Sequence, residues 1–165
     1  MAEPDNSLDK KLAEVEAKLH EYTTSKGVGP NKKLQYKDIE DYIQMDRKEL
    51  RGLSEEDCGE IAYLLGQTSL ELQREINEKT AVSKWLDGQI IKAVSSQVNN
   101  YKNYSYEGNK NAAINDNDFA SKANTIKNRY DVRILSLQYL AQEVKNLSSI
   151  ILSIRDTKRR HNQNA

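Results

Sequence analysis

The chain has 165 residues, enough for one domain with a single core and too few for two well-buried domains. Only 37% of the residues are apolar and 30% are charged, which suits a helical protein with a narrow core better than a compact globule. No apolar run approaches the roughly eighteen residues of a membrane span, and the N-terminus lacks the apolar core of a signal peptide, so we expect a cytoplasmic protein.

The zero net charge conceals an asymmetry between the two ends of the chain. Residues 1–60 hold 10 Lys and Arg against 15 Asp and Glu, a net charge of −5, whereas residues 101–165 hold 11 against 6, a net charge of +5. This division permits two different partners, contacts between the ends of neighbouring copies, or simple attraction between the two halves.

Residues 1–35 predict an acidic helical arm followed by a linker. Ser7 is the expected N-cap of a first helix, and the glycines and proline of "GVGP", residues 27–30, end its pattern. A shorter amphipathic helix is expected in "YKDIEDYIQM", residues 36–45. The first helix is predicted from apolar residues at helical spacing, namely Leu8, Leu12, Val15 and Leu19.

The main domain, residues 36–165, is predicted to contain two long helices. The first is expected over about residues 54–101, because "SEED" places the hydroxyl of Ser54 ahead of an acidic first turn. Its main apolar face, broken by Lys79 and Ser83, comprises Ile61, Leu65, Thr68, Leu72, Ile76, Leu86, Ile90, Val94, Val98 and Tyr101.

A second apolar stripe lies on nearly the opposite side of this predicted helix. Two apolar faces on one helix indicate two neighbours. One neighbour is the C-terminal helix, and the other is either the folded-back arm or another copy of the protein. The stripe comprises Tyr63, Leu70, Ala81 and Trp85.

The last helix is expected over about residues 117–160, beginning in "NDND". Its apolar residues step by four and three, which predicts left-handed coiled-coil packing. Arg133 is the one charge in core phase, and we expect it either to set the register or to mark a functional site. The apolar core-phase residues are Phe119, Ala123, Ile126, Tyr130, Leu137, Leu140, Val144, Leu147, Ile151 and Ile154.

Together these elements predict an all-α fold. It is an elongated antiparallel hairpin of two long helices with coiled-coil-like packing, joined through residues 102–115, plus short N-terminal helices. Such a hairpin leaves much of both stripes in water, and apolar burial stabilises by about 25 cal/mol per Å². We therefore expect a homo-oligomer, and the candidate residues of an oligomer or partner interface are Tyr63, Leu70, Trp85 and Arg133.

The sequence carries no pattern of catalytic residues. His20 and His161 lie near opposite ends of the chain, and Cys58 has no histidine near it in sequence. No nucleophile elbow and no metal-ligand spacing occurs. We therefore expect a protein that is not an enzyme, with no cofactor, metal site or small-molecule substrate.

The stretch "NNYKNYSYEGNK", residues 99–110, is rich in tyrosine, lysine and asparagine. Aromatic rings that stack on bases, beside cations that meet phosphates, hold single strands without sequence preference. Tyr101 and Tyr104 continue the core stripe, so packing alone explains them, whereas Tyr106 lies beyond it. The candidate DNA-binding residues are Lys84, Lys102, Tyr104, Tyr106, Lys110, Arg129, Lys158, Arg159 and Arg160.

Four segments within residues 40–160 resemble a family of small all-helical proteins of large tailed bacteriophages: "LSEEDCGEIAYLL", "LQREINEKTAVSKWL", "YKNYSYEGNKNAAINDNDFA" and "LQYLAQEVKNLSSIILSIRDTKRR". Their layout is similar to that of T-even-type recombination mediators. The resemblance implies a ring-forming oligomer that binds single-stranded DNA and helps to load a recombinase onto strands covered by single-strand-binding protein. It assigns a DNA-binding role to Lys84, Trp85, Lys102, Tyr104 and Tyr106.

Two functional hypotheses follow. The first is a DNA-binding oligomer of phage recombination or replication in the cytoplasm of an infected bacterial host, with a recombinase or a single-strand-binding protein as a further partner. The second is a structural or adaptor protein of the phage particle or its assembly, which acts through helix–helix contacts. The acidic N-terminal half and zero net charge differ from those of a strongly basic DNA binder.

Overall fold

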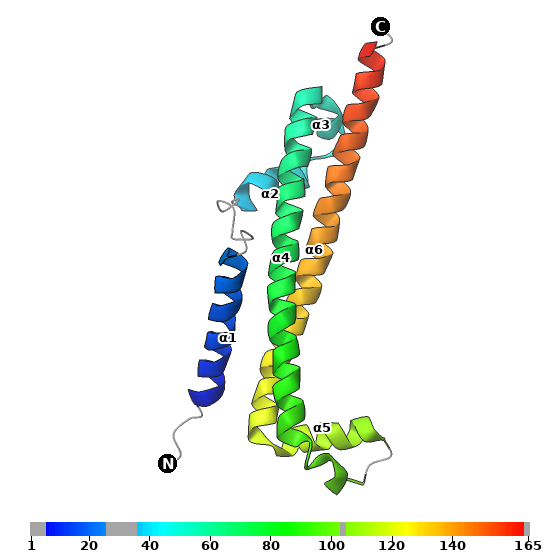
Figure 1. Ribbon diagram of the computed structural model, residues 1–165. Coiled ribbons are helices and arrows are strands. Elements are labelled where there is room, and N and C mark those ends of the chain that lie inside the picture. Colours follow the sequence, from blue (N-terminus) through cyan, green and yellow to red (C-terminus); the bar gives the residue numbers. More distant parts are fainter. Residues whose placement is uncertain (1–5, 26–35, 103–104, 164–165) are drawn as a thin grey trace. The chain divides into compact units, whose positions relative to one another are not determined.

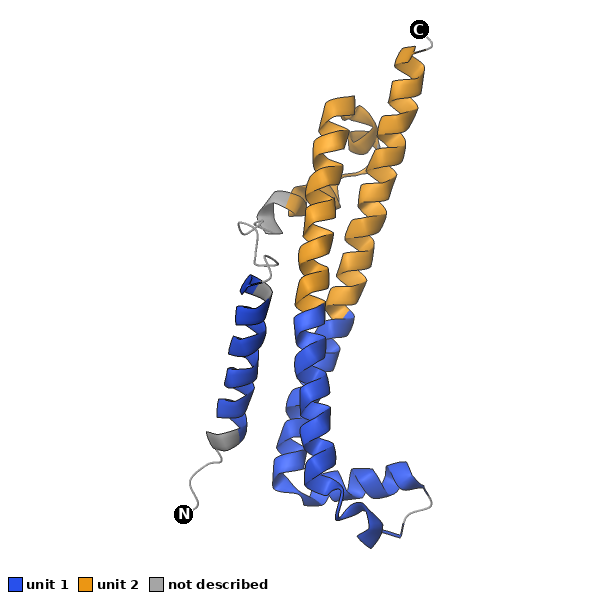
Figure 2. Cartoon of the chain, viewed as in Figure 1, with its two compact units in different colours: residues 1–29, 77–135 blue, residues 30–76, 136–165 orange. Residues whose placement is uncertain are grey.

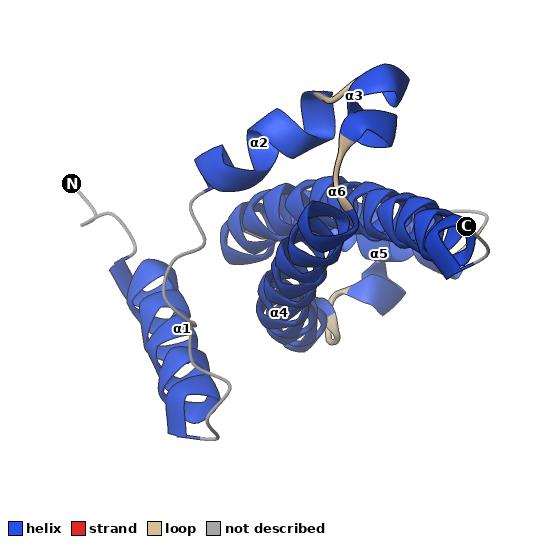
Figure 3. Cartoon of the chain, turned by 90° about the horizontal axis from the view of Figure 1, so that it is seen from above, coloured by secondary structure: helices blue, strands red, loops and turns tan. Residues whose placement is uncertain are grey.

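The computed structural model describes residues 6–25, 36–102 and 105–163, and its described residues contain helices and no strand (Figures 1 and 3). The predicted all-α fold, in which two long helices pack against each other, is confirmed. The elements are α1 (Asn6–Ser25), α2 (Tyr36–Gln44), α3 (Arg47–Gly52), α4 (Glu55–Val94), the 3₁₀ helix η1 (Val98–Asn100), α5 (Tyr106–Asp116) and α6 (Asp118–Gln163).

The chain divides into two compact units (Figure 2). Unit 1 comprises residues 1–29 and 77–135, and unit 2 comprises residues 30–76 and 136–165. Each unit contains one segment of α4 and one segment of α6, which run antiparallel. Each unit therefore has its own part of the helical hairpin and its own helices packed on it.

The core of unit 1 includes α1. Leu8 of α1 is only 3% exposed and belongs to the same apolar cluster as Leu86 and Ile90 of α4. Trp85 and Tyr130 pack against this cluster. The remaining buried members are Val82, Val94, Val98, Ala113, Ile114, Ala120 and Ala123.

The core of unit 2 lies along α4 and α6, with α2 and α3 contributing one buried residue each, Ile39 and Leu50. The Ser148 hydroxyl of α6 donates a hydrogen bond of 3.1 Å to the Ala62 carbonyl of α4, which supports a close approach of the two backbones. The other buried residues described for this unit are Cys58, Ile61, Ala62, Leu65, Thr68, Leu72, Ile76, Leu137, Ala141, Val144 and Ile151.

Both predicted starts of the long helices are confirmed, and each has a visible cap. Asp57 N–H donates to the Ser54 hydroxyl at 3.0 Å, and that hydroxyl donates to the Asp57 carboxylate at 2.6 Å. The bond from the Ser54 hydroxyl, together with one from Ser54 N–H to the same carboxylate at 3.1 Å, lowers the pKa of Asp57. At the start of α6, Ala120 N–H donates to the side-chain oxygen of Asn117 at 3.0 Å. Caps of this kind satisfy backbone donors that the first turn leaves unpaired.

The predicted end of the first long helix and the predicted connection were wrong. Helix α4 ends at Val94 instead of continuing to residue 101. Beyond Val94 the backbone tightens, because Gln97 N–H donates to the Val94 carbonyl at 2.8 Å, a bond of three-residue spacing that leads into η1. Residues 102–115 were expected to connect the long helices, but they contain most of α5, which begins after Ser105 accepts a hydrogen bond from Gly108 N–H at 3.0 Å.

Candidate nucleic-acid and partner-binding surfaces

The tyrosine-rich segment contains one packed tyrosine and one exposed tyrosine. Tyr101 is half-buried against the unit 1 core, and its hydroxyl donates to Asp116 at 2.7 Å, a bond that raises the pKa of Tyr101. Tyr106, the first residue of α5, is 71% exposed, and Lys102 is also exposed. Tyr104 lies outside the described residues. The core therefore accounts for Tyr101 and leaves the ring of Tyr106 available to a ligand.

The other candidate cations of unit 1 lie on three different helices. Lys84 of α4 and Arg129 of α6 are exposed, and Lys110 of α5 is half-buried. Lys127 of α6, by contrast, pairs with Asp131 at 2.7 Å. Each of these three candidate cations therefore lies on a different helix of unit 1.

The basic end of α6 divides into structural and exposed residues. The Lys158 ammonium donates to the Arg51 carbonyl at 2.7 Å and to the Leu53 carbonyl, both at the C-terminal end of α3. Arg159 and Arg160 are exposed. Lys158 therefore joins α3 to α6 within unit 2, a role that sequence reasoning missed because the carbonyls lie more than 100 residues away.

The four candidate interface residues have different surroundings. Tyr63 and Leu70 on the unit 2 part of α4 are 67% and 63% exposed. Trp85 is half-buried in unit 1 against the cluster that contains Leu8. The second neighbour near Trp85 is thus the folded-back arm, one of the two alternatives that the apolar stripes allowed.

Arg133 is exposed, so the expected charge in core phase is not buried. The buried face of α6 is rotated slightly from the predicted one. Its most buried apolar residues fall on two neighbouring rows of seven-residue spacing, and Arg133 belongs to neither row. The first row includes Ala123, Leu137, Val144 and Ile151, and the second includes Ala120 and Ala141.

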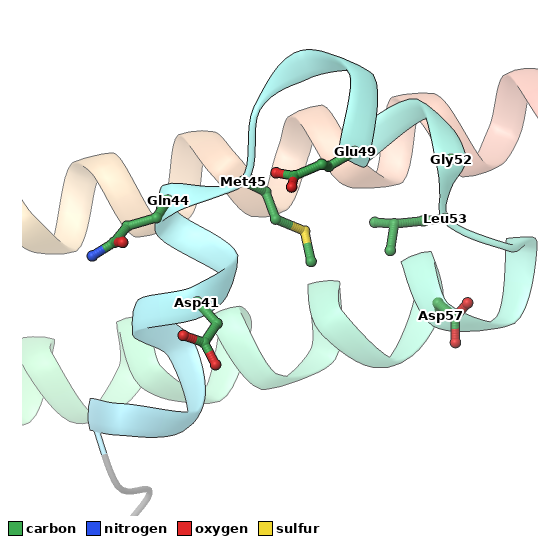
Figure 4. A pocket seen from close by; sticks show the side chains of 7 residues that line it. All are labelled: Asp41, Gln44, Met45, Glu49, Gly52, Leu53 and Asp57. Atoms are coloured by element: carbon green, nitrogen blue, oxygen red, sulfur yellow. The ribbon is translucent and has the colours of Figure 1, made fainter.

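A hollow in unit 2 was not anticipated from the sequence. It lies between α2, α3 and the first turn of α4, and three carboxylates line it together with Met45 and Leu53 (Figure 4). Two of these carboxylates already serve helix caps: Glu49 accepts a hydrogen bond from Asp46 N–H at 2.8 Å, and Asp57 bonds to Ser54. Glu49 and Asp57 therefore have local roles in starting α3 and α4. The lining is completed by Asp41, Gln44 and Gly52.

Comparison with known proteins identifies no relative: no protein-family model, curated protein or solved structure matches the chain. Within the described ranges, no group of three or more His, Cys, Asp or Glu side chains could hold a metal ion. Nor does any helix in that part of the chain combine the length and apolarity needed to span a membrane.

Proposed function

We propose that the protein is an oligomeric helical phage protein that binds single-stranded DNA in recombination or replication, in the manner of a recombination mediator. The observation that carries this proposal is the exposed ring of Tyr106 at the start of α5, four residues after the exposed Lys102 in the sequence. A tyrosine that packs in no core offers a flat surface for a base, and a neighbouring ammonium group offers a charge for a phosphate. The resemblance of residues 40–160 to phage mediators supports the same function.

In this proposal the exposed cations neutralise the phosphate backbone, and the aromatic ring stacks on an unpaired base. Stacking contributes about 1–3 kcal/mol per base, and each neutralised phosphate releases condensed counterions. Binding is therefore expected to fall steeply as salt rises. Base stacking and phosphate contacts do not read base edges, so sequence preference is expected to be weak. A recombinase or a single-strand-binding protein would be the protein partner.

The test is fluorescence anisotropy of a labelled single-stranded oligonucleotide at low and moderate salt, with the mass of the protein measured on the same sample. Lys102→Ala combined with Tyr106→Ala should weaken binding about tenfold or more and reduce the salt dependence by about one released ion. Tyr139→Ala combined with Lys145→Ala is the matched control, because it removes an exposed tyrosine and an exposed lysine of α6. Equal losses in both double variants would contradict the proposed site.

A second candidate function is that of a structural or adaptor protein of the phage particle or its assembly. The exposure of Tyr63, Leu70 and Tyr139 favours it, because large apolar side chains on a helix surface are typical of protein interfaces. This function predicts a well-formed oligomer that binds no single-stranded DNA even at low salt.

A further inference from the structure

One face of α4 in unit 2 alternates exposed large side chains with glycines. Tyr63 and Leu70 are 67% and 63% exposed, and Gly59 and Gly66 stand between and beside them. The four positions are spaced by four, three and four residues. This is the spacing of a coiled-coil seam, in which alternate steps of three and four keep residues on one side of the helix.

The two glycines have no packing role among the residues that the structure describes. A Cβ atom built on Gly59 or on Gly66 meets nothing in that part of the chain within 4 Å, so alanine or a larger residue would fit there. Glycine is also among the weakest helix formers, and both residues lie inside a 40-residue helix. Since neither the fold nor helix propensity favours glycine here, their absent side chains point to close approach by something outside the chain.

The seam is distinct from the face that holds unit 2 together. The buried face of this segment includes Ile61, Leu65 and Leu72, all 5% exposed or less. The exposed seam therefore gives the same stretch of α4 a second helix-packing surface. A helix is the occupant that fits, because knobs spaced by seven residues, Tyr63 and Leu70, alternate with holes spaced by seven, Gly59 and Gly66.

We propose that this seam binds the same seam of a second copy of the chain, with the two α4 helices antiparallel. If the two-fold axis passes between residues 64 and 65, Tyr63 of each copy faces Gly66 of the other. The same axis places Leu70 of each copy against Gly59 of the other. Every large side chain then meets a glycine, so the surface is complementary to itself, as an isologous interface requires.

The charges near the seam favour the antiparallel direction. Glu55, Glu56, Asp57 and Glu60 form an acidic first part of α4. A parallel pair would place the two acidic segments side by side, whereas an antiparallel pair places them at opposite ends of the contact. A parallel pair would also set Tyr63 against Tyr63 and leave the glycines facing each other across a gap.

The size of the side chain at position 66 provides the first test, measured by sedimentation velocity without nucleic acid. Gly66→Leu should weaken association at least tenfold and leave monomer helicity equal or higher, because the position is open in the chain. Gly88→Leu is the matched control. Gly88 is a helical glycine of α4 that is also open, but it lies 18 residues beyond Leu70, about 27 Å along the helix.

An exchange of knob and hole gives a stronger test of the pairing. Gly66→Tyr alone should abolish association, because it would oppose Tyr63 of the second copy. Adding Tyr63→Gly should restore association, since each new tyrosine would again face a glycine. Unchanged association in Gly66→Leu, or no recovery in the exchanged variant, would overturn the proposed contact.

Spin-label distances test the direction of the pair. In a Cys58→Ala background, labels at Glu56→Cys should lie about 25 Å apart along the axis, and labels at Gln67→Cys about 8 Å. Equal distances at the two sites would instead indicate a parallel pair. The inference rests on the proposed function only for the expected self-association. A protein that binds DNA as a monomer would overturn the pairing and leave the DNA-binding proposal intact.

Discussion

The Ser83 hydroxyl of α4 donates a hydrogen bond to the Asp131 carboxylate of α6 at 2.6 Å, within unit 1. Ser83 is 6% exposed and interrupts the apolar stripe of α4, so its hydroxyl needs a partner in the core. The second carboxylate oxygen of Asp131 binds Lys127 at 2.7 Å. One acid thus satisfies a buried hydroxyl and is held in place by a cation of its own helix.

Removal of the two partners should have unequal effects on stability. Ser83→Ala leaves Asp131 with Lys127 and with water, because that carboxylate side chain is 39% exposed, so we expect a loss of about 0.5–1 kcal/mol. Asp131→Ala leaves a buried hydroxyl without its partner, and a loss of about 1–3 kcal/mol is expected. Urea unfolding of both single variants and the double variant measures the coupling. A coupling energy of zero would show that the bond does not contribute in solution.

The contact between α1 and α6 should be sensitive to high pH. The Tyr130 hydroxyl donates to the Glu16 carboxylate, and burial and this bond raise the pKa of Tyr130 from 10.0 to about 12. Since the raised pKa belongs to the folded state, the stability contribution is complete below pH 10 and is lost as the pH rises through 12. Trp85 packs against the same cluster, so its fluorescence can report the change. Tyr130→Phe should remove this pH dependence.

The control for that titration is Tyr139→Phe, which alters an exposed tyrosine of α6 in unit 2. It should leave the alkaline transition of Trp85 unchanged. A transition that persists in Tyr130→Phe would mean that another group governs the docking of α1 at high pH.

The long helices could be predicted because their signals are local and repeated. Helical periodicity and the Ser54 cap identified α4 and α6. The two ends of the connection were missed for a different reason. Helix α5 has no clear apolar face, and α4 gives way after Val94 to hydrogen bonds of three-residue spacing, such as that from Gln97 N–H to the Val94 carbonyl. Such features depend on single hydrogen bonds, which periodicity does not reveal.

The candidate sites were harder to predict, because exposure depends on tertiary contacts. Arg133 has core phase but is exposed, because the most buried residues of α6 fall on two other rows, which include Leu137 and Ala141. Lys158 was predicted from its place in a basic cluster, yet its ammonium binds carbonyls of α3. Tyr63 and Leu70 were recognised as a second stripe, but the alternation with open glycines became meaningful only with the structure.

Lys158→Ala should destabilise unit 2, because the carbonyls of Arg51 and Leu53 lose a charged donor. Hydrogen bonds to charged groups contribute about 1.5–3 kcal/mol, and partial exposure of Lys158 reduces the expected loss to about 1 kcal/mol. Arg159→Ala is the matched control, since the neighbouring cation is exposed and should leave stability within about 0.5 kcal/mol. Urea unfolding compares the two variants. Equal stabilities would show that Lys158 is part of the solvated basic surface alone.

Leu8→Ala tests whether α1 belongs to the unit 1 core in solution. Leu8 is 3% exposed, and large-to-small changes at buried leucines remove about 2–5 kcal/mol. Here the loss should appear as detachment of α1, because the other helices of the cluster retain their own contacts. Trp85 emission should therefore shift to longer wavelength, while overall helicity falls by no more than the contribution of α1.

Leu135→Ala is the control, since Leu135 is 66% exposed in the same unit. An unshifted Trp85 spectrum in Leu8→Ala would mean that α1 does not cover this part of α4. DNA binding should survive the change, because the arm carries none of the candidate DNA-binding residues.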